Sequence, residues 1–193
     1  MVAESVEKDL ESLMVRYQSG DIDAFDGLYH ELSPPLARYL LSLARNPTIS
    51  DELVQETFLQ IHRSRHTYQR GRSVRSWAFG VARYVFLMNR RSRRSREDQE
   101  SQADVFALDL PMPSWMDSWL DRDQLGQLVG KLKPSYREAL LLHHVWGFSF
   151  KEIGRILGIR ETTAKVRAHR GMEQLRSEAG AGGQQVEELA SGS

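Results

Sequence analysis

The sequence predicts an all-helical fold, and three observations point to it. Apolar residues recur with the 3.6-residue period of an α-helix in most segments, whereas alternating strand patterns are scarce. The 193 residues exceed a typical domain of about 150 residues but fall short of two such domains, so one domain or two small ones are possible. An acidic stretch containing proline separates two helical regions, which favours two small helical domains joined by a linker.

Composition excludes several classes of protein. Hydrophobic residues make up 40% and charged residues 27% of the chain, so most of it can bury a core. The absence of Cys excludes a disulfide, a thiolate zinc site and a cysteine nucleophile, and is typical of a reducing compartment. The acidic N-terminal residues do not resemble a secretion signal, and no run of about 18 apolar residues suggests a membrane span. We therefore expect a cytoplasmic protein without membrane insertion.

Charge is segregated along the chain, although the formal net charge is zero. Residues 1–56 have four basic and eleven acidic side chains, a net charge of −7, whereas residues 57–96 have eleven Arg and no acidic residue. Residues 97–130 return to −7, residues 131–176 reach +6, and the tail 177–193 has −3. The two basic segments can therefore meet phosphate, while the acidic ones must face elsewhere or imitate a polyanion.

The first domain is expected to cover residues 1–96. A helix is predicted from Ser50, which can cap it, with Asp51 and Glu52 at the positive end of its dipole. Its apolar stripe is Leu53, Val54, Phe58 and Ile61, and a second line on its surface is Glu52, Gln55, Glu56 and Leu59. Upstream, residues 23–43 are expected to form one or two helices interrupted near Ser33-Pro34-Pro35. The inward-facing candidates there are Phe25, Leu28, Tyr29, Leu32, Leu36, Tyr39 and Leu40.

A loop is expected over residues 67–73, followed by a helix from about Val74 to Arg94. In this basic segment aromatic residues alternate with Arg, as expected where unpaired bases stack on rings while guanidinium groups hold the backbone. About half of the aromatics are instead expected to pack in the core, since Trp77, Val81 and Val85 fall on one side of a helix. The aromatics concerned are Tyr68, Trp77, Phe79, Tyr84 and Phe86.

The second domain is expected over residues 128–177, after an acidic, flexible linker at residues 97–127. A helix is predicted from Leu128 to Val145, with Pro134 at a start or a joint. Ser149 and Glu152 have the spacing of a capping box, so a short helix should run to about Leu157. After a turn at residues 158–160, a last helix is expected to end near Arg176, and the glycine-rich tail 178–193 is expected to be disordered.

The two helices around Gly158 form the strongest functional signal, because their pattern predicts a helix-turn-helix. This motif needs a short first helix, a tight turn and a second helix whose outer face enters the DNA major groove. Ala164, Ala168, Met172 and Leu175 mark the buried side of the second helix. Thr162, Lys165, Val166 and His169 face away from it, and Arg167 and Arg170 flank them at positions suited to phosphates. An ordinary helical hairpin with a solvated basic face is the weaker alternative.

No pattern of residues predicts catalysis, a cofactor or a metal. His62 and His66 have the spacing of metal ligands on a helix, but their basic surroundings would repel a cation, which favours solvated or phosphate-contacting histidines. Glycine-rich phosphate loops, nucleophile elbows and credible carboxylate pairs are missing from the sequence. We therefore expect no enzyme activity and no bound cofactor.

At its two basic segments the chain resembles bacterial sigma factors of the extracytoplasmic-function class, which consist of two helical domains joined by a linker. Residues 51–58 (DELVQETF) resemble the helix of sigma region 2 that docks on core RNA polymerase. Residues 74–83 (VRSWAFGVAR) are similar to its promoter-melting helix. Residues 132–142, 147–154, 157–159 and 163–170 resemble sigma region 4, the reader of the minus-thirty-five element.

The resemblance implies three sets of binding residues. Docking on the beta-prime clamp of core polymerase is expected to use Asp51, Glu52, Gln55, Glu56, Leu59 and Arg63. The minus-ten element and a flipped base of the melted non-template strand are expected to contact Tyr68, Arg70, Arg72, Ser73, Arg75, Trp77, Arg83, Tyr84, Arg90 and Arg91. The duplex at minus thirty-five is expected to contact Arg160, Glu161, Thr162, Thr163, Lys165, Val166, Arg167, His169 and Arg170. An anti-sigma factor is a further expected partner.

Some positions depart from the pattern of that family. Tyr84 and Met88 stand where the family commonly has Asn and Asp, which leaves open the base preference at minus ten. Arg160 stands where a capping residue such as Ser is usual, at a cost of about 1 kcal/mol to the helix. The acidic linker suggests the hypothesis that its carboxylates imitate a nucleic-acid backbone in the channel that nascent RNA later uses. A stand-alone duplex-binding regulator and, less favoured, a small enzyme remain alternatives.

Overall fold

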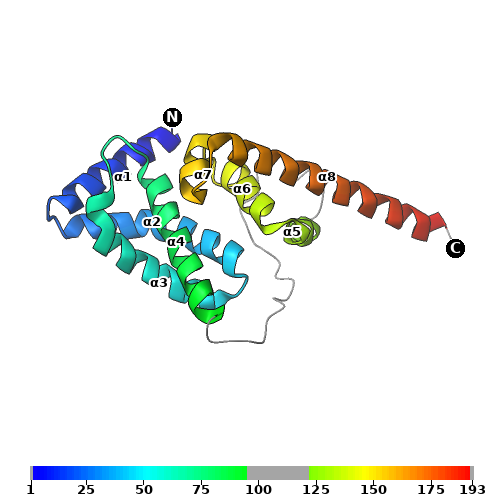
Figure 1. Cartoon of the computed structure of the whole chain (residues 1–193), viewed down its shortest axis with the longest axis horizontal. Coiled ribbons are helices and arrows are strands. Elements are labelled where there is room, and N and C mark those ends of the chain that lie inside the picture. Colours follow the sequence, from blue (N-terminus) through cyan, green and yellow to red (C-terminus); the bar gives the residue numbers. More distant parts are fainter. Residues whose placement is uncertain (1, 95–121, 192–193) are drawn as a thin grey trace. The chain divides into compact units, whose positions relative to one another are not determined.

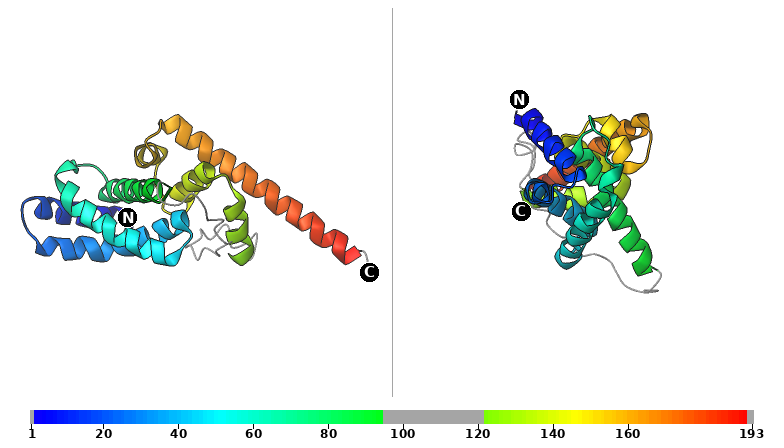
Figure 2. Two further views of the ribbon diagram at one scale, coloured as in Figure 1. Left: turned by 60° about the horizontal axis from the view of Figure 1, so that its bottom comes forward. Right: turned by 90° about the vertical axis from the view of Figure 1, so that its left-hand side faces the viewer.

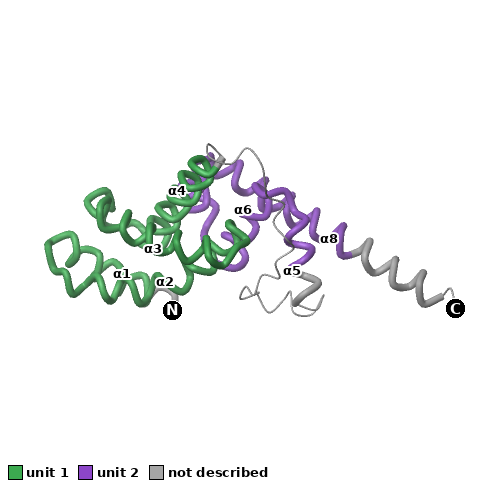
Figure 3. Tube along the Cα trace, turned by 90° about the horizontal axis from the view of Figure 1, so that it is seen from below, with its two compact units in different colours: residues 1–103 green, residues 104–193 purple. Residues whose placement is uncertain are grey.

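The computed structural model describes residues 2–94 and 122–191, and within these residues every regular element is helical. The chain divides into two compact units, residues 1–103 and residues 104–193, shown in two colours in Figure 3. The expectation of two small helical domains is therefore confirmed. Most of the stretch expected to be a linker, residues 97–121, lies outside the described residues.

Four helices build the first unit (Figure 1). They are α1 (Val2–Gln18), α2 (Asp23–Ala44), α3 (Pro47–Ser64) and α4 (Val74–Arg94), with a short 3₁₀ turn, η1 (Arg65–Thr67), after α3. Helix α2 packs against the other three, and Figure 2 shows the helices from two further directions. The side chains of Tyr39 and Phe79 stack in the core with ring centroids 4.9 Å apart, joining α2 to α4. The expected bounds of the Arg-rich helix α4 are confirmed.

Helix α1 was not predicted from the sequence. Its first residues are acidic and polar, and they gave no capping signal strong enough to set a helix start. Leu10, Met14 and Tyr17 nevertheless recur at i, i+4 and i+7, and all three are buried. This stripe docks α1 on α2 and α4 and makes it part of the bundle.

Helix α2 runs without a break through Pro34 and Pro35, so the expected interruption there was wrong. Each proline removes one backbone hydrogen bond, which favours a break when only local structure counts. Leu32, Leu36 and Leu40 lie at four-residue steps across this site and are at most 1% exposed, so burial of the continuous face outweighs the lost bonds. The inward assignment also fails for Tyr29, which is 48% exposed.

Helix α3 begins three residues earlier than expected. Asn46 is its N-cap, with the side chain accepting a hydrogen bond from the Ile49 backbone N–H at 3.1 Å, and Pro47 occupies the first turn. Ser50 therefore lies inside the helix instead of capping it. Its buried hydroxyl donates to the Ala37 carbonyl of α2 at 3.3 Å. The expected helix start at Ser50 was therefore wrong.

The second unit contains α5 (Arg122–Lys131), α6 (Pro134–His144), α7 (Phe150–Leu157) and α8 (Glu161–Ser191), and α8 contacts all the others. The single helix expected over residues 128–145 is thus two helices, with Pro134 starting the second. Helix α5 takes in residues 122–127, which were assigned to the linker. Helix α8 continues to Ser191 where an end near Arg176 and a disordered tail were expected.

The start of α7 and the turn that follows it have the predicted local structure. The Ser149 hydroxyl accepts a hydrogen bond from the Glu152 N–H at 3.3 Å, and the Glu152 carboxylate accepts one from the Ser149 N–H at 2.9 Å. This reciprocal pair confirms the capping box. Gly158 ends α7 with φ +65°, a left-handed conformation that favours glycine. No helix within the described residues is long and apolar enough to cross a membrane.

Candidate nucleic-acid interface

The two faces of the α8 N-terminal half have the predicted division. Ala164, Ala168, Met172 and Leu175 are each at most 8% exposed and pack toward the rest of the unit. The exposed residues on the opposite side are Thr162, Lys165, Val166, His169 and Arg170, with Arg167 half-buried beside them. At the helix start Arg160 and Glu161 are exposed and Thr163 is half-buried. Basic and polar groups therefore share one outward face, as a helix that enters the major groove requires.

Two glycines allow α8 to lie close to its neighbours. A Cβ placed on Gly154 of α7 would lie 2.9 Å from the Ile159 carbonyl oxygen and 3.3 Å from the Glu161 N. A Cβ on Gly171 of α8 would lie 3.0 Å from the Tyr136 carbonyl oxygen of α6. All three distances are shorter than ordinary packing contacts, so the placement of α8 depends on these two residues lacking a side chain.

Ion pairs and hydrogen bonds fix part of the outward face. Arg170 Nη1 donates to the Tyr136 hydroxyl of α6 at 3.4 Å, and this hydrogen bond lowers the pKa of Tyr136. His169 Nε2 lies 3.3 Å from the Glu173 carboxylate, one turn along α8. Arg170 is therefore directed by its own unit before any DNA is present, whereas Lys165 is simply exposed.

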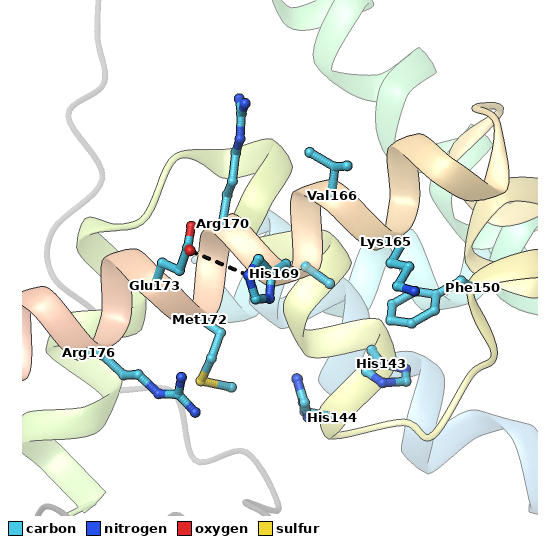
Figure 4. A pocket seen from close by; sticks show the side chains of 11 residues that line it. His143, His144, Phe150, Lys165, Val166, His169, Arg170, Met172, Glu173 and Arg176 are labelled. Carbon is cyan, nitrogen blue, oxygen red and sulfur yellow. Dashed lines mark ion pairs between the residues drawn. The ribbon is translucent and has the colours of Figure 1, made fainter.

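A pocket of about 720 Å³ opens beside this face (Figure 4). Phe150 and Met172 supply apolar surface, and His143 and His144 line it from α6. The His143 ring stacks on Phe150 with centroids 4.2 Å apart, and its Nδ1 lies 2.9 Å from the Phe148 carbonyl oxygen. Lys165, Val166, His169 and Arg170 contribute to the same pocket, so it shares its rim with the predicted reading face.

Helix α4 turns a different side to the core from the one expected. The buried residues Val74, Ala78, Ala82 and Val85 form the inward stripe, together with Phe79. Trp77 and Val81, expected on the same side as Val85, are only half-buried at its edge. The exposed face carries Tyr84, Leu87, Met88, Arg90 and Arg91, and the half-buried Gly80 has nothing within 4 Å of an added Cβ. Arg75 and Arg83 are half-buried.

Tyr68 belongs to the interior of the loop that leads into α4. It is 4% exposed, and its hydroxyl donates to the Arg72 carbonyl at 2.6 Å. Its ring lies edge-on to the Trp77 ring, with ring centroids 5.8 Å apart. Burial, with smaller contributions from the charges of Glu11 and Glu7, raises the pKa of Tyr68 to about 12. The expectation that this ring contacts bases is therefore corrected, because it packs against the protein instead.

The remaining residues predicted for the minus-ten element lie at the surface of the first unit. Arg70 and Arg72 are exposed in the loop, and Ser73 is half-buried with its hydroxyl accepting from the Ser76 N–H at 3.0 Å. The indole Nε1 of Trp77 donates to the Thr67 hydroxyl at 3.3 Å. The loop and the outer side of α4 therefore present cations and aromatic groups together, the combination suited to an unpaired strand.

The predicted docking residues of α3 form one exposed face. Asp51, Glu52, Gln55, Glu56, Leu59 and Arg63 are all exposed, and Leu59 is 51% exposed although apolar. Arg63 Nη1 lies 3.5 Å from the Glu56 carboxylate, and Arg93 of α4 lies 3.8 Å from the Glu52 carboxylate. These surface ion pairs contribute little to stability, so the face remains available to a partner.

Of the two histidines that have metal-ligand spacing, His62 and His66, the first bonds to a side chain of α1. His62 Nδ1 shares a hydrogen bond with the Tyr17 hydroxyl, and among the described residues no cluster of three potential metal ligands occurs.

Sequence reasoning missed another group in this region: Glu7, Glu11 and Gln18 of α1 bond to the backbone around the loop before α4. A helix-spaced series of polar residues facing a loop more than 45 positions away leaves no local signal in the sequence.

Comparison with known proteins assigns both units. Models of "Sigma-70 region 2" and "Sigma-70, region 4" match residues 28–96 and 122–175. The RNA polymerase sigma factor CarQ of Myxococcus xanthus is 35% identical over 84% of this chain and 93% of its own length. The extracytoplasmic-function sigma factor SigF of Caulobacter vibrioides is 33% identical over 88% of this chain and 93% of its own.

Solved structures share the fold. The sigma factor RpoE in complex with the anti-sigma factor NepR from Bartonella quintana superposes with a TM-score of 0.67 at 23% identity, over 81% of this chain and 96% of the other. CnrH in complex with the cytosolic domain of CnrY gives 0.66 at 21% identity, over 90% and 98%. The match of residues 28–96 to region 2 disfavours the alternative of a stand-alone duplex-binding regulator, in which the first unit would be a protein-interaction module. The chain therefore belongs to the extracytoplasmic-function sigma factors, which bind core RNA polymerase and direct promoter recognition and transcription initiation.

Proposed function

We propose that each of the three exposed faces has one task in initiation. The α3 face, residues 51–63, docks on the clamp of core polymerase. The loop 68–73 and the outer side of α4 hold the melted non-template strand at the minus-ten element. The α8 face reads the duplex at minus thirty-five. Nucleotide addition is carried out by the polymerase, and the chain works with it in the cytoplasm.

The division of α8 into two faces is the observation that carries this proposal. Its small buried residues Ala164 and Ala168 bring the helix onto its unit, while Lys165 and His169 are directed outward. A lysine in the major groove donates to guanine O6 and N7, and flanking arginines neutralise phosphates. The minus-ten assignment is supported by the exposed Arg70, Arg72, Arg90 and Arg91 together with Tyr84.

A regulatory protein partner forms part of the proposal. The relative from Bartonella quintana was solved with an anti-sigma factor, and a partner of that kind would cover DNA-binding or docking faces until initiation. The acidic residues 97–121 are proposed to run among basic walls of the polymerase, where their carboxylates imitate a nucleic-acid backbone.

Run-off transcription tests the proposal. Purified core polymerase is combined with the chain and a library of promoters randomised at minus ten and minus thirty-five, and the transcribed templates are sequenced. We expect enrichment at both elements and none with core polymerase alone. Templates enriched at minus thirty-five only, together with tight duplex binding by the chain without polymerase, would contradict the assignment of the first unit.

A further inference from the structure

Helix α1 holds the loop before α4 at both ends and in its middle. Gln18 Nε2 donates to the Arg65 carbonyl at 2.7 Å and to the Tyr68 carbonyl at 3.0 Å. The Glu11 carboxylate accepts from the Gly71 N–H at 2.6 Å, and the Glu7 carboxylate accepts from the Val74 N–H. Three side chains of one helix therefore bind four backbone groups between residues 65 and 74.

The two amides among these groups, of Gly71 and Val74, bond to carboxylates of α1, whereas the Arg65 carbonyl also accepts from the Tyr68 N–H within the loop at 3.2 Å. Val74 begins α4, where the first N–H groups of a helix have no partner within it and attract negative charge. Gly71 has φ +75°, so the chain turns here through a conformation open to glycine. The carboxylates of Glu7 and Glu11 fix this turn and the helix start at the same time.

The loop side chains are left facing outward by this arrangement. Arg70 and Arg72 are exposed, whereas Tyr68 fills the loop interior and bonds to the Arg72 carbonyl. A binding loop that is already ordered loses less conformational entropy when its ligand arrives, which strengthens binding without any new contact.

We infer that Glu7, Glu11 and Gln18 are positioning residues for promoter opening, which hold the loop 68–73 in the shape that receives the melted strand. The inference rests on the proposed role of that loop. It also explains why an acidic helix belongs to a DNA-binding unit: its carboxylates bond to backbone N–H groups of the protein. Leu10, Met14 and Tyr17 anchor α1 in the core independently, so the polar contacts can be removed while the helix stays docked.

The test compares holoenzymes carrying Glu11→Ala, Glu11→Gln and Asp9→Ala on a promoter recovered from the library. Gln keeps an oxygen that accepts the Gly71 N–H, and Asp9 is an exposed carboxylate on the same helix, which serves as the matched control. Opening is measured by permanganate reactivity of unpaired thymines and core binding by pull-down. Exchange of the Gly71 amide is measured by NMR on the free chain.

For Glu11→Ala we expect about tenfold less promoter opening, faster exchange at Gly71 and unchanged core binding. Glu11→Gln should recover most of the opening, and Asp9→Ala should behave as wild type. Opening at the wild-type level by Glu11→Ala would overturn the inference. Increased opening would also overturn it, since the carboxylate would then be competing with a DNA phosphate for the amide.

An Arg72→Ala holoenzyme separates failure of this inference from failure of the proposed function. If Arg72→Ala opens poorly while Glu11→Ala opens normally, the loop acts on DNA but does not need α1 to hold it. If Arg70→Ala and Arg72→Ala both open promoters normally, the loop has no part in opening and both proposals fall.

Discussion

Arg170 of α8 donates a hydrogen bond to the hydroxyl of Tyr136 on α6, with Nη1 and Oη 3.4 Å apart. The bond reaches from the outward face of the recognition helix to the helix behind it and directs the guanidinium to one side. Lys165, five residues earlier, is exposed on the same helix. The two cations are therefore held differently: Arg170 is directed by Tyr136, whereas Lys165 is exposed beside the pocket that Phe150 lines.

Substitution of these cations should separate base reading from phosphate anchoring. Lys165→Ala should cost about 1–3 kcal/mol on the preferred minus-thirty-five sequence and relax the preference at one base pair. Arg170→Ala should weaken all sequences similarly and reduce the salt slope by about one unit. Promoter competition with holoenzyme, across single-base variants and several salt concentrations, measures both effects.

Tyr136→Phe is the matched control for Arg170, because it removes only the hydroxyl that accepts the bond. It should weaken binding less than Arg170→Ala and leave base preference unchanged. Uniform loss for Lys165→Ala combined with sequence-selective loss for Arg170→Ala would mean that the helix is rotated in the groove, and the assignment of Thr162 and His169 would fail with it.

The docking face should tolerate substitution without loss of fold. Gln55 and Glu56 are exposed, opposite the buried Leu53 and Ile61, and the pair of Glu56 with Arg63 is a surface ion pair worth about 0–1 kcal/mol. The double change Gln55→Ala with Glu56→Ala should therefore keep its helical circular dichroism but lose core polymerase in a pull-down. Glu31→Ala on α2 controls for the loss of one exposed carboxylate. If both variants bound as much core polymerase as each other in the pull-down, the α3 face would have no docking role.

The turn between α7 and α8 should be intolerant of a methyl group at Gly154. Its Cβ would lie 2.9 Å from the Ile159 carbonyl oxygen, a backbone atom that cannot move aside alone, so Gly154→Ala should destabilise the unit by roughly 1–3 kcal/mol. Hydrogen exchange of α7 and α8 peptides in the full chain measures the loss, with the first unit as internal reference. Gly158→Ala meets no neighbour and should lose only about 1–2 kcal/mol through its φ of +65°. A Gly154→Ala chain with wild-type protection would show that the turn relaxes more easily than its geometry suggests.

The helix-turn-helix could be predicted in detail because its signals are local. A serine three residues before a glutamate, a glycine at the turn and alanines at four-residue spacing each fix structure within one or two helical turns. The start of α3 was missed although Asn46 before Pro47 is also a local signal, because Ser50 before two acidic residues offered a competing cap. For α4 the apolar residues 77–82 are nearly continuous, so periodicity alone could not decide which side faces the core.

What the sequence could not supply depends on contacts between distant residues. The prolines of α2 are tolerated because three leucines bury one continuous face against other helices. The bond from Glu11 to the Gly71 N–H spans 60 positions, and burial of Tyr68 depends on the same neighbourhood. Composition identified the aromatic and Arg-rich segment, but only the packed bundle separates Tyr68, which fills the loop, from Tyr84, which is exposed.

Stability of the second unit should fall as the solution becomes acidic, because of His144. Burial lowers the pKa of His144 below its ordinary value of 6.5, and the charge of the neighbouring His143 lowers it further. The unfolded chain then binds the proton more readily than the folded chain. The contribution of neutral His144 to the free energy of unfolding is therefore fully present above pH 6.5 and is lost as the pH falls toward the pKa of the folded state. Urea unfolding followed by hydrogen exchange of α6 peptides at pH 5.5 and pH 7.5 measures it. His144→Gln should flatten the dependence, and an unchanged slope in that variant would assign the effect to other groups.

Gly80 offers a test in which stability and function should change in opposite directions. It lies inside α4 near the exposed Tyr84, and an added Cβ has nothing within 4 Å, so Gly80→Ala should stabilise the free chain by about 0.5–1 kcal/mol through helix propensity. If the melted strand passes over this face, the methyl group intrudes on it, and holoenzyme should open promoters more slowly despite the more stable fold. Thermal unfolding of the chain and permanganate reactivity of the promoter measure the two effects.

Ser12→Ala, at an exposed position of α1, is the matched control, because it also raises helix propensity but lies on a different helix. It should stabilise the chain and leave opening unchanged. Opening by Gly80→Ala at the wild-type rate, with the stability gain present, would place the strand away from Gly80 and Tyr84. The Arg90 and Arg91 end of α4 and the loop arginines would then have to hold the strand without that part of the helix.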